Sequence, residues 1–396
     1  MLTKKIGDLV PSALKENIRD YGMYIALGFI ILIFNSLTNG LFLTPRVISD
    51  LIDMTGYIAV LAVGMTLVIV IRHIDLSVGF VAGFLGAVAA ILSSRVGLPL
   101  YLIIPIVMAI GIIIGMWNGF LVAKMGVPAF VVTLAGMLLF RGALIRITNS
   151  ETIFTGNETF NAIGNGYIPD IASVDGLHIL SLIIGLLGIA LFIYNEVKSR
   201  NKQASYGLHV STLPLFIAKL AFVSMIISYF VWQLASFKGF SYTMLIVGVV
   251  VAIYHFITKS TTLGRHIYAV GGNPEAAELS GISVSKITYT VFGSMTMLAA
   301  LSGILFTARL QSATPTAGQL FELDAIAAAY VGGVSASGGV GKVTGSIIGA
   351  LVMASLTKGM DLMNVGVSYQ YIIRGLVLVA AVVFDVKTRN MRSKKA

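Results

Sequence analysis

The feature that most constrains the fold of this chain is a succession of long apolar stretches separated by short polar ones. A helix needs about 20 mostly apolar residues to cross the core of a membrane, and glycine or proline within it is tolerated. On that rule the sequence predicts about twelve spans, at residues 21–43, 52–71, 76–94, 98–122, 127–147, 177–194, 213–235, 240–258, 287–309, 324–338, 343–357 and 367–385. The tenth and eleventh are short and rich in glycine, so we expect broken helices there. The predicted fold is all-α, a polytopic membrane helical bundle of roughly 10 to 12 spans.

Composition agrees with a membrane protein and excludes several kinds of site. Hydrophobic residues make up 57% of the chain and charged residues only 11%, whereas a soluble domain has about 25% charged residues. The absence of cysteine excludes disulfides, iron–sulfur clusters and cysteine-ligated zinc. The five histidines show no metal-ligand spacing. We therefore expect no metal site, and orientation in the membrane explains the net charge of +10 better than nucleic-acid binding does.

The distribution of lysine and arginine predicts how the chain is oriented. With the N-terminus in the cytoplasm, the loops on that side carry most of the basic residues, as the positive-inside rule requires. An even number of spans then places both termini in the cytoplasm, together with the polar stretch 259–286. We expect a cytoplasmic segment at 1–20, a single transmembrane domain at 21–386 and a basic cytoplasmic tail at 387–396.

Two parts of the sequence resemble each other in the order of their small motifs. Two glycines seven residues apart, the second followed by valine, occur twice. Each time, an Arg-Gly pair follows inside the next span. Each time, a span of small residues with an acidic residue at its start comes before. An odd number of spans separates the equivalent elements, which reverses their direction. We interpret this as an inverted repeat of spans 2–5 and 9–12; the alternative is chance similarity among glycine-rich helices. The matching residues are Gly119, Gly126 and Val127 with Gly359, Gly366 and Val367, Arg141 with Arg374, and Asp75 with Asp324.

The polar stretch 259–286 contains a short predicted helix. Asn273 is a good N-cap, Pro274 suits the first turn, and Glu275 favours the positive N-terminal end. Gly281 is a natural C-terminal cap, and the residues between are helix formers, Ala276, Ala277, Glu278 and Leu279. A helix this short is not stable alone in water, so it must pack against another element.

Ionisable residues near or within spans are costly in lipid and are candidates for function. They are Asp75, Arg141, Lys219, Asp324, Asp361 and Arg374. Asp75 precedes Ser77 at the start of a span, where helix capping and gating are equally open interpretations. We expect the two arginines to face the bundle and to pair with carboxylates or carbonyls, whereas Lys219 can snorkel to the nearby cytoplasmic end. Asn118 is uncharged and suits contacts with another helix or with a hydroxyl group.

The glycine-rich segment 338–345, GGVGKVTG, does not match a nucleotide-binding loop. A Walker A motif needs GxxxxGK[ST], but Ala336 stands at the position of the first glycine and Val343 replaces the serine or threonine. We expect a tight turn between two spans at this place. The chain is therefore not expected to hydrolyse nucleotides or to be an enzyme.

Four blocks of this sequence resemble bacterial ABC sugar-importer permeases of the ribose, galactose and xylose class. The resemblance extends over about residues 21–385. The length, the block at 133–149 and two additional spans around 177–235 look most like the xylose-type permease. The chain departs from the family pattern at Arg72-His73, where many members carry small or acidic residues. The four blocks are IDLSVG (74–79), NGFLVAKMGVPAFVVTLAGM (118–137), GRHIYAVGGNPEAAELSGI (264–282) and ELDAIAAAYVGG (322–333).

The resemblance implies an ABC-importer permease fold and a set of partners. The short helix would be the coupling helix that docks in a groove of a separate cytoplasmic ATPase, through Asn273, Pro274, Glu275, Ala276, Ala277, Glu278 and Gly281. ATP and magnesium would be used by that ATPase, so no cofactor is expected on this chain. The other implied partners are an extracytoplasmic sugar-binding protein, a second copy of the permease and the lipid of the bacterial cytoplasmic membrane.

The function that this implies is import of a monosaccharide, a pentose such as xylose, by alternating access. A sugar path needs polar groups for hydroxyls and apolar surface for C–H faces. The expected pathway and gate residues are Asp75, Ser77, Asn118, Phe130, Thr133, Arg141, Asp324 and Tyr330. The alternatives are an ABC permease for ribose, galactose, an autoinducer-type furanone or a branched-chain amino acid, and a proton-coupled secondary sugar transporter.

Overall fold

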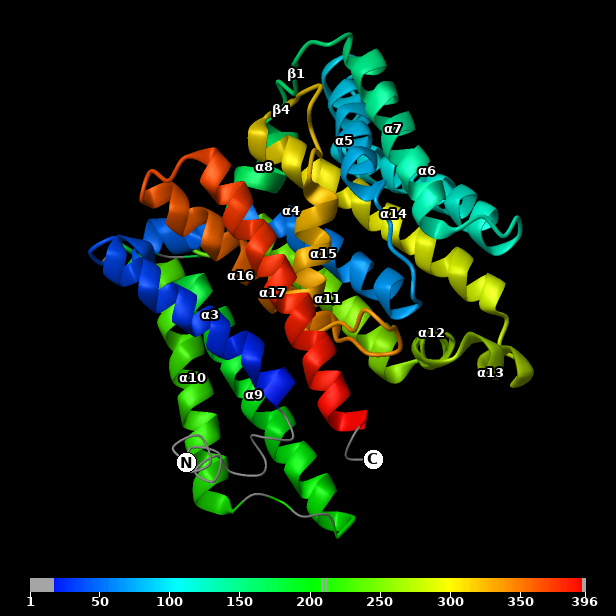
Figure 1. The fold of residues 1–396 in the computed structure, drawn as a ribbon. Helices are drawn as coiled ribbons and strands as arrows, with labels where there is room; N and C mark the ends of the chain where they lie inside the picture. Colours follow the sequence, from blue (N-terminus) through cyan, green and yellow to red (C-terminus); the bar gives the residue numbers. More distant parts are fainter. Residues whose placement is uncertain (1–17, 172, 175, 208–209, 211, 394–396) are drawn as a thin grey trace.

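The structure is a computed structural model that describes residues 18–393 apart from 172, 175, 208–209 and 211 (Figure 1). Residues 1–17 of the predicted cytoplasmic segment lie outside the described residues. Within the described part of the chain, each predicted span corresponds to one helix. These helices are α3 (Ile18–Leu37), α4 (Pro45–Val70), α5 (Val78–Ser94), α6 (Leu100–Ala123), α7 (Ala129–Thr148), α9 (Ile179–Ser205), α10 (Leu213–Ala235), α11 (Tyr242–Ser260), α14 (Val284–Leu310), α15 (Phe321–Val331), α16 (Val343–Leu362) and α17 (Val367–Ser393).

The lengths and hydropathy of these helices confirm the predicted polytopic membrane bundle. Among the described residues, 8 helices are long and apolar enough to cross a membrane. Shorter apolar helical stretches lie at Gly22–Leu37, Val78–Ser94 and Val367–Val383. Helix α17 continues to Ser393 and so extends through most of the stretch predicted as a C-terminal tail.

Shorter elements lie at the two ends of the bundle. At one end α12 (Thr262–Gly272) and α13 (Pro274–Leu279) join α11 to α14, and we call this end the α13 face (Figure 1). The other end, which we call the α8 face, carries α8 (Glu158–Asn165) and the 3-10 helix η1 (Leu41–Leu43). Two pairs of short antiparallel strands lie there among the described residues, β1 (Ile153–Phe154) with β4 (Ser312–Ala313) and β2 (Ser173–Val174) with β3 (Leu177–His178).

Helices α4 and α14 form the centre of the bundle. Both are apolar over most of their circumference and mostly buried, as expected of helices surrounded by protein. They are antiparallel, because Gly64 of α4 lies against Met295 of α14, while Ser302 further along α14 donates a hydrogen bond to the carbonyl of Tyr57 (2.8 Å).

Each central helix packs against helices of the other half of the chain. Helix α14 packs on α5 and α6, and α4 packs on α15 and α16. Small residues allow these close contacts in lipid: Cβ atoms on Gly111 or Gly115 would collide with the backbone of α14, and one on Gly349 would collide with the backbone of α15. This reciprocal packing, with α4 and α14 antiparallel, is the arrangement that an inverted repeat of spans 2–5 and 9–12 requires.

Non-helical segments separate α4 from α5 and α14 from α15, and we call them the α4–α5 break and the α14–α15 break. The N-terminal ends of α5 and α15 meet where Gly79 contacts Gly318, so closely that a Cβ on either would collide with the backbone or side-chain atoms opposite. The prediction of a short tenth helix is confirmed, because α15 ends at Val331 and a turn follows. The prediction of a broken eleventh helix is wrong: α16 is continuous, since Gly345 and Gly349 serve packing against α15 and its following turn.

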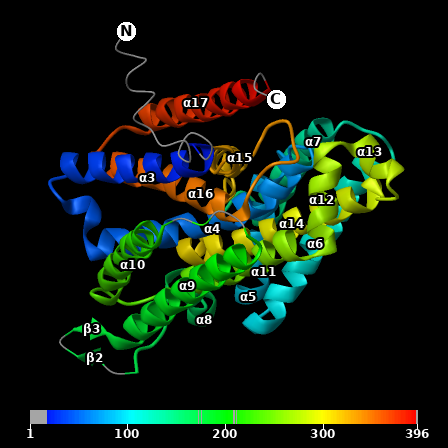
Figure 2. The ribbon, with the colours of Figure 1, turned by 90° about the horizontal axis from the view of Figure 1, so that it is seen from below.

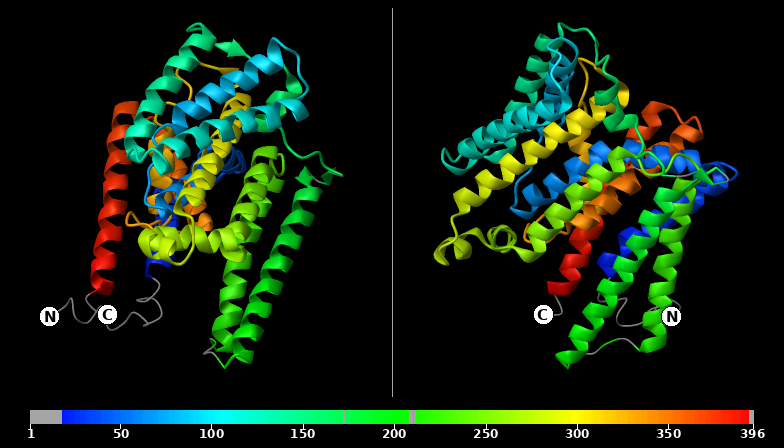
Figure 3. Two further views of the ribbon diagram at one scale, coloured as in Figure 1. Left: turned by 90° about the vertical axis from the view of Figure 1, so that its right-hand side faces the viewer. Right: turned by 180° about the vertical axis from the view of Figure 1, so that it is seen from behind.

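The α9–α10 hairpin lies at the edge of the molecule, opposite α6 and α7 (Figures 2 and 3). It is joined to the bundle through a narrow neck on the α8 face, where Ile168 donates to the carbonyl of Phe240 (2.9 Å) and Tyr242 donates to that of Gly166 (3.1 Å). Towards the other end of the hairpin, Lys219 of α10 bonds Glu196 of α9 at 2.7 Å. The hairpin is thus inserted between α8 and α11, and at the α8 face Leu234 of α10 also packs against Ile48 of α4.

Candidate functional site

The first candidate site is α13, which forms as its sequence predicts. The Asn273 side chain accepts a hydrogen bond from the Ala276 amide at 3.1 Å, as an N-cap does. At the other end Gly281 has a left-handed φ of 81°. The amides of Gly281 and Ile282 reach back to the carbonyls of Glu278 (2.9 Å) and Ala277 (3.0 Å), which is a Schellman motif.

Helix α13 is supported within its own chain and exposes the rest of its surface. Ala277 is only 5% exposed and belongs to the main apolar core, and α13 packs on α12 and α14. In contrast, Leu279 is 90% exposed, and Glu275, Ala276 and Glu278 are also exposed. An exposed leucine flanked by carboxylates on a rigid short helix is suited to contact with another protein.

Helix α12 connects α13 to the interior of the bundle. Thr261 caps its first turn by accepting from the Gly264 amide at 3.2 Å, and Ile267 and Val270 are buried. The Tyr268 hydroxyl donates to the carbonyl of Gly341, in the turn between α15 and α16, at 2.6 Å. Burial raises the pKa of Tyr268 above its ordinary value, which further favours the neutral hydroxyl that donates this bond.

The second candidate site is a buried polar cluster at the α4–α5 break. Asp75 accepts from the amide (2.9 Å) and the hydroxyl (2.6 Å) of Ser77 with one carboxylate oxygen. Asn118 of α6 donates to the Ser77 hydroxyl at 3.5 Å, and the Thr133 hydroxyl of α7 lies 3.3 Å from the carbonyl of Ile74. Asp75 is 0% exposed, and its second oxygen has no hydrogen-bond partner among the described residues. Four of the predicted pathway residues therefore come together.

The other four predicted pathway residues lie elsewhere. Phe130 projects from the exposed surface of α7. Arg141 is exposed, and its guanidinium lies over the ring of Phe80, 5.7 Å from its centre. The prediction that it faces the bundle and pairs with a carboxylate or carbonyl is therefore wrong, and a cation–π contact takes the place of that pair. Tyr330 borders an apolar cavity beside α3 and α17, and Asp324 belongs to a separate ion pair.

That ion pair joins α15 to α17. Arg374 lies 3.3 Å from Asp324, which confirms the prediction that this arginine faces the bundle and pairs with a carboxylate. Both residues border a small cavity of about 40 Å³ beside Tyr57 of α4 and a larger one of about 290 Å³ beside Tyr371. The pair therefore separates the interior of the bundle from a cavity between α15, α16 and α17.

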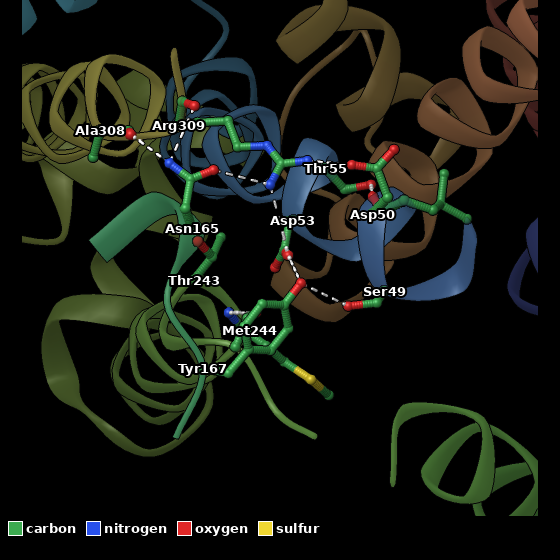
Figure 4. A network of polar contacts seen from close by, with 12 residues as sticks. Ser49, Asp50, Asp53, Thr55, Asn165, Tyr167, Thr243, Met244, Ala308 and Arg309 are labelled. Carbon is green, nitrogen blue, oxygen red and sulfur yellow. Dashed lines mark hydrogen bonds and ion pairs between the residues drawn. The ribbon is translucent and has the colours of Figure 1, made fainter. Parts of the chain in front are cut away.

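A charged network on the α8 face escaped the sequence reasoning (Figure 4). The Arg309 guanidinium, at the end of α14, bonds Asp50 of α4, lies 3.9 Å from Asp53 and donates to the Asn165 side chain (3.3 Å). Lys358 of α16 bonds the second oxygen of Asp50. The signal was present: Arg309 and Lys358 are basic residues on the side where few are expected, so they needed acidic partners.

Tyr167 extends this network towards the α9–α10 hairpin. Its hydroxyl bonds Asp53 (3.3 Å) and lies 3.2 Å from the Ser49 hydroxyl, and its ring lies against Phe237 and under the Lys238 ammonium. A cleft of about 440 Å³ borders the network. Because Asp50 of α4 bonds both Arg309 of α14 and Lys358 of α16, the network holds these three helices together, and Tyr167 attaches the segment after α8 to α4.

Comparison with known proteins places the chain in a family. Residues 47–382 match the family model described as the permease component of branched-chain amino acid transport systems. The chain is similar to the xylose transport system permease protein of Haemophilus influenzae, with 40% identity over 374 residues that cover 94% of this chain and 98% of that protein. The corresponding Escherichia coli K12 protein is 40% identical over 380 residues, covering 96% and 95%.

A ribose import permease protein of Haemophilus influenzae is 36% identical over 366 residues, which cover 91% of each chain. No solved structure gives a significant match to the chain. The family match, the near full-length similarity and the membrane helices together mean that the chain belongs to the family of ABC transport-system permease components.

Proposed function

We propose that this chain is the membrane-spanning subunit of an ATP-driven importer that carries a monosaccharide, xylose or a related pentose, into the cytoplasm. The observation that carries the proposal is 40% identity to a xylose transport system permease over nearly the whole of both chains. The uncharged polar residues Ser77, Asn118 and Thr133 at the α4–α5 break support it, because sugar hydroxyls need such partners.

The α13 face would be cytoplasmic, in a bacterial inner membrane. Basic residues on this side include Lys124, Lys259, Arg265, Lys286 and Lys342, which fits the positive-inside rule. The start of α3 and the end of α17 lie on the same side as α13 (Figure 1), so both termini would also be cytoplasmic. The α8 face would then receive the sugar from an extracytoplasmic binding protein.

Helix α13 would dock in a groove of a separate ATPase subunit. Leu279 supplies apolar contact area, and Glu275 and Glu278 supply charge around it. ATP and magnesium would be used by that ATPase, and a second copy of this chain would complete the transporter. Alternating access would then consist of the two interlocked halves moving about the breaks that precede α5 and α15.

Uptake into proteoliposomes tests the proposal. The vesicles contain this chain, its ATPase and, outside, its binding protein, and the measured quantity is labelled xylose retained with ATP inside. We expect uptake that requires all three proteins and ATP. Uptake that follows a pH gradient without ATP or the ATPase would show a proton-coupled carrier and overturn the proposal.

A ribose importer is the second candidate, because a ribose import permease is 36% identical over 91% of this chain. The same vesicles discriminate the two when labelled xylose, ribose and galactose are supplied in separate experiments. Uptake of ribose alone would move the assignment to ribose. Uptake of a labelled branched-chain amino acid and of none of these sugars would remove sugars altogether.

A further inference from the structure

Three backbone segments meet at the α13 face in what we call the Arg72 junction, formed by Arg72, Gly271, Gly272, Gly338 and Gly339. The Arg72 Nε donates to the carbonyl of Gly271 at 2.7 Å, and a terminal nitrogen of the same guanidinium bonds the carbonyl of Gly272. The Gly339 amide donates to the carbonyl of Val70 at 2.8 Å. The end of α4, the end of α12 and the turn after α15 are thus bonded to one another.

Glycine makes the contacts of this junction direct. A Cβ on Gly271 would collide with the carbonyl of Val70, and one on Gly338 would collide with the Arg72 side chain. A Cβ on Gly339 would lie 2.9 Å from the Cα of Gly272. Because backbone lies directly against backbone here, rearrangement of side chains can absorb little of a displacement of α12.

The backbone of Arg72 indicates that its side chain has a task. Arg72 has a left-handed φ of 65°, and the His73 amide bonds the carbonyl of Val68 at 3.0 Å. Arg72 therefore occupies the position after a helix C-terminus that glycine normally takes. A glycine here would suit the backbone better, so the guanidinium must contribute something that glycine lacks. Its two bonds go to the last carbonyls of α12, where a cation is also favoured by the helix dipole.

The three segments lead to the parts of the molecule that must move together. Helix α12 continues directly into α13. Three residues after Arg72, the chain reaches Asp75 and the buried polar cluster, and the turn with Gly338 and Gly339 connects α15 to α16. Figure 1 shows this turn beside α12.

We propose that Arg72 is a positioning residue for transport: its guanidinium holds the end of α12 to the α4–α5 break, so that movement of α13 displaces the break and the α15–α16 turn as one body. This inference rests on the proposed function, in which an ATPase moves α13. Arg72 touches neither sugar nor nucleotide, and it determines how much transport results from each ATP hydrolysed.

The test is Arg72→Gly, which relieves the left-handed backbone and removes the guanidinium. We expect the variant to insert, to bind the ATPase and to hydrolyse ATP at a normal rate in the presence of the binding protein and sugar. We expect the sugar transported per ATP to fall about tenfold. Arg95→Gly removes a guanidinium at the end of α5, outside the junction, from a residue with a right-handed backbone, and as the control its ratio should equal that of the wild type.

The ratio separates positioning from a merely structural role, which would lower ATP hydrolysis and transport together. An unchanged ratio in Arg72→Gly overturns the inference. If that variant fails to insert, Arg72→Lys decides in its place, because it keeps the charge and loses the forked pair of bonds, and a wild-type ratio in it overturns the inference as well. Failure of the proposed function is recognised separately, because the wild-type vesicles would then show no ATP-dependent uptake.

A distance measurement supplies an independent readout. The chain has no cysteine, so spin labels can be attached at His266→Cys on α12, outside the proposed docking residues, and at Val340→Cys in the turn, both exposed positions. With ATP and the ATPase, we expect the label distance to stay narrow in the otherwise wild-type chain and to broaden with Arg72→Gly. Equal distributions in the two would contradict the inference.

Discussion

The two faces of this molecule use their charged side chains differently. On the α8 face, Asp50 joins Arg309 and Lys358, so the contacts are between charged side chains of distant helices. On the α13 face, Gly271 and Gly339 bring backbone against backbone, with Arg72 bonding carbonyl oxygens. Ion pairs can separate and form again as units, whereas packed backbones move together. From this difference we expect the charged contacts of the α8 face to contribute stability and the backbone contacts at Gly271 and Gly339 to transmit a displacement of α12.

The largest expected effect comes from substitutions in α13, the exposed helix of the α13 face. Glu275→Lys combined with Ala277→Asp reverses one surface charge and places a carboxylate at a position that is 5% exposed. A buried unpaired charge costs several kcal/mol or displaces the helix, so ATP-dependent uptake should fall to background and the ATPase should no longer co-purify. Lys198→Gln, which removes one exposed charge from α9 in the α9–α10 hairpin, is the control, with activity retained. Survival of uptake and co-purification in the double variant would show that α13 is not the coupling helix.

The second prediction concerns removal of the carboxylate that Arg309 and Lys358 share on the α8 face. Asp50→Asn leaves Arg309 and Lys358 without their shared carboxylate, and these partners are only partly exposed. The free energy of unfolding should fall by about 2 kcal/mol, measured as a lower thermal midpoint in detergent. Asp50→Glu keeps the charge, so its thermal midpoint should fall less than that of Asp50→Asn. A midpoint that does not change in Asp50→Asn would mean that the network adds nothing to stability.

A smaller effect separates docking from folding on the α13 face. Leu279→Ser changes a side chain that is 90% exposed, so the stability of the isolated chain should not change. If Leu279 enters a groove of the ATPase, its loss should weaken association by about 1.5 kcal/mol, roughly tenfold in Kd. Titration of labelled ATPase against the two permeases measures this. Equal Kd values would place the contact elsewhere on α13.

The smallest effect concerns Asp170 on the α8 face. Desolvation favours its neutral acid, but the amides of Leu180, Ile179 and Ile171 outweigh this and hold the pKa of Asp170 below its ordinary value. The stabilisation is therefore present above the unfolded-state pKa of about 3.9 and is lost as pH falls through the lower folded-state pKa. Asp170→Asn should have a slightly lower thermal midpoint than the wild type at pH 7, and the two should converge in acid. A gap that widens as pH falls would reverse this assignment.

The sequence predicted the spans and α13 because their determinants are local. Apolar length specifies a membrane helix wherever it packs, and Asn273 and Gly281 cap α13 through bonds to residues within a few positions. Glycine was a less certain guide, since the same residue type ends α15 at Gly332 and packs α16 at Gly349.

The sites that depend on partners distant in sequence were predicted only in part. Ser77 and Asn118 were expected in one path and do meet, but nothing in their spacing separates them from Asp324 or Tyr330, which lie elsewhere. The Asp50–Arg309 contact joins residues 259 positions apart. Such groups meet only when the helices have assembled. The sequence marks Arg72 as a departure from the family pattern, but it does not indicate that backbone carbonyls are its partners.

The narrow neck of the α9–α10 hairpin has a consequence for how chains of this kind vary in length. Gly166 and Tyr242 are already bonded across the neck, so α8 and α11 would stay where they are if the segment between them were reduced to a tight turn. A hairpin also crosses the membrane twice, so its removal would leave every later loop on its original side. We therefore expect that chains of this kind can lack this pair of membrane helices when one loop and the contact of α10 with α4 are replaced.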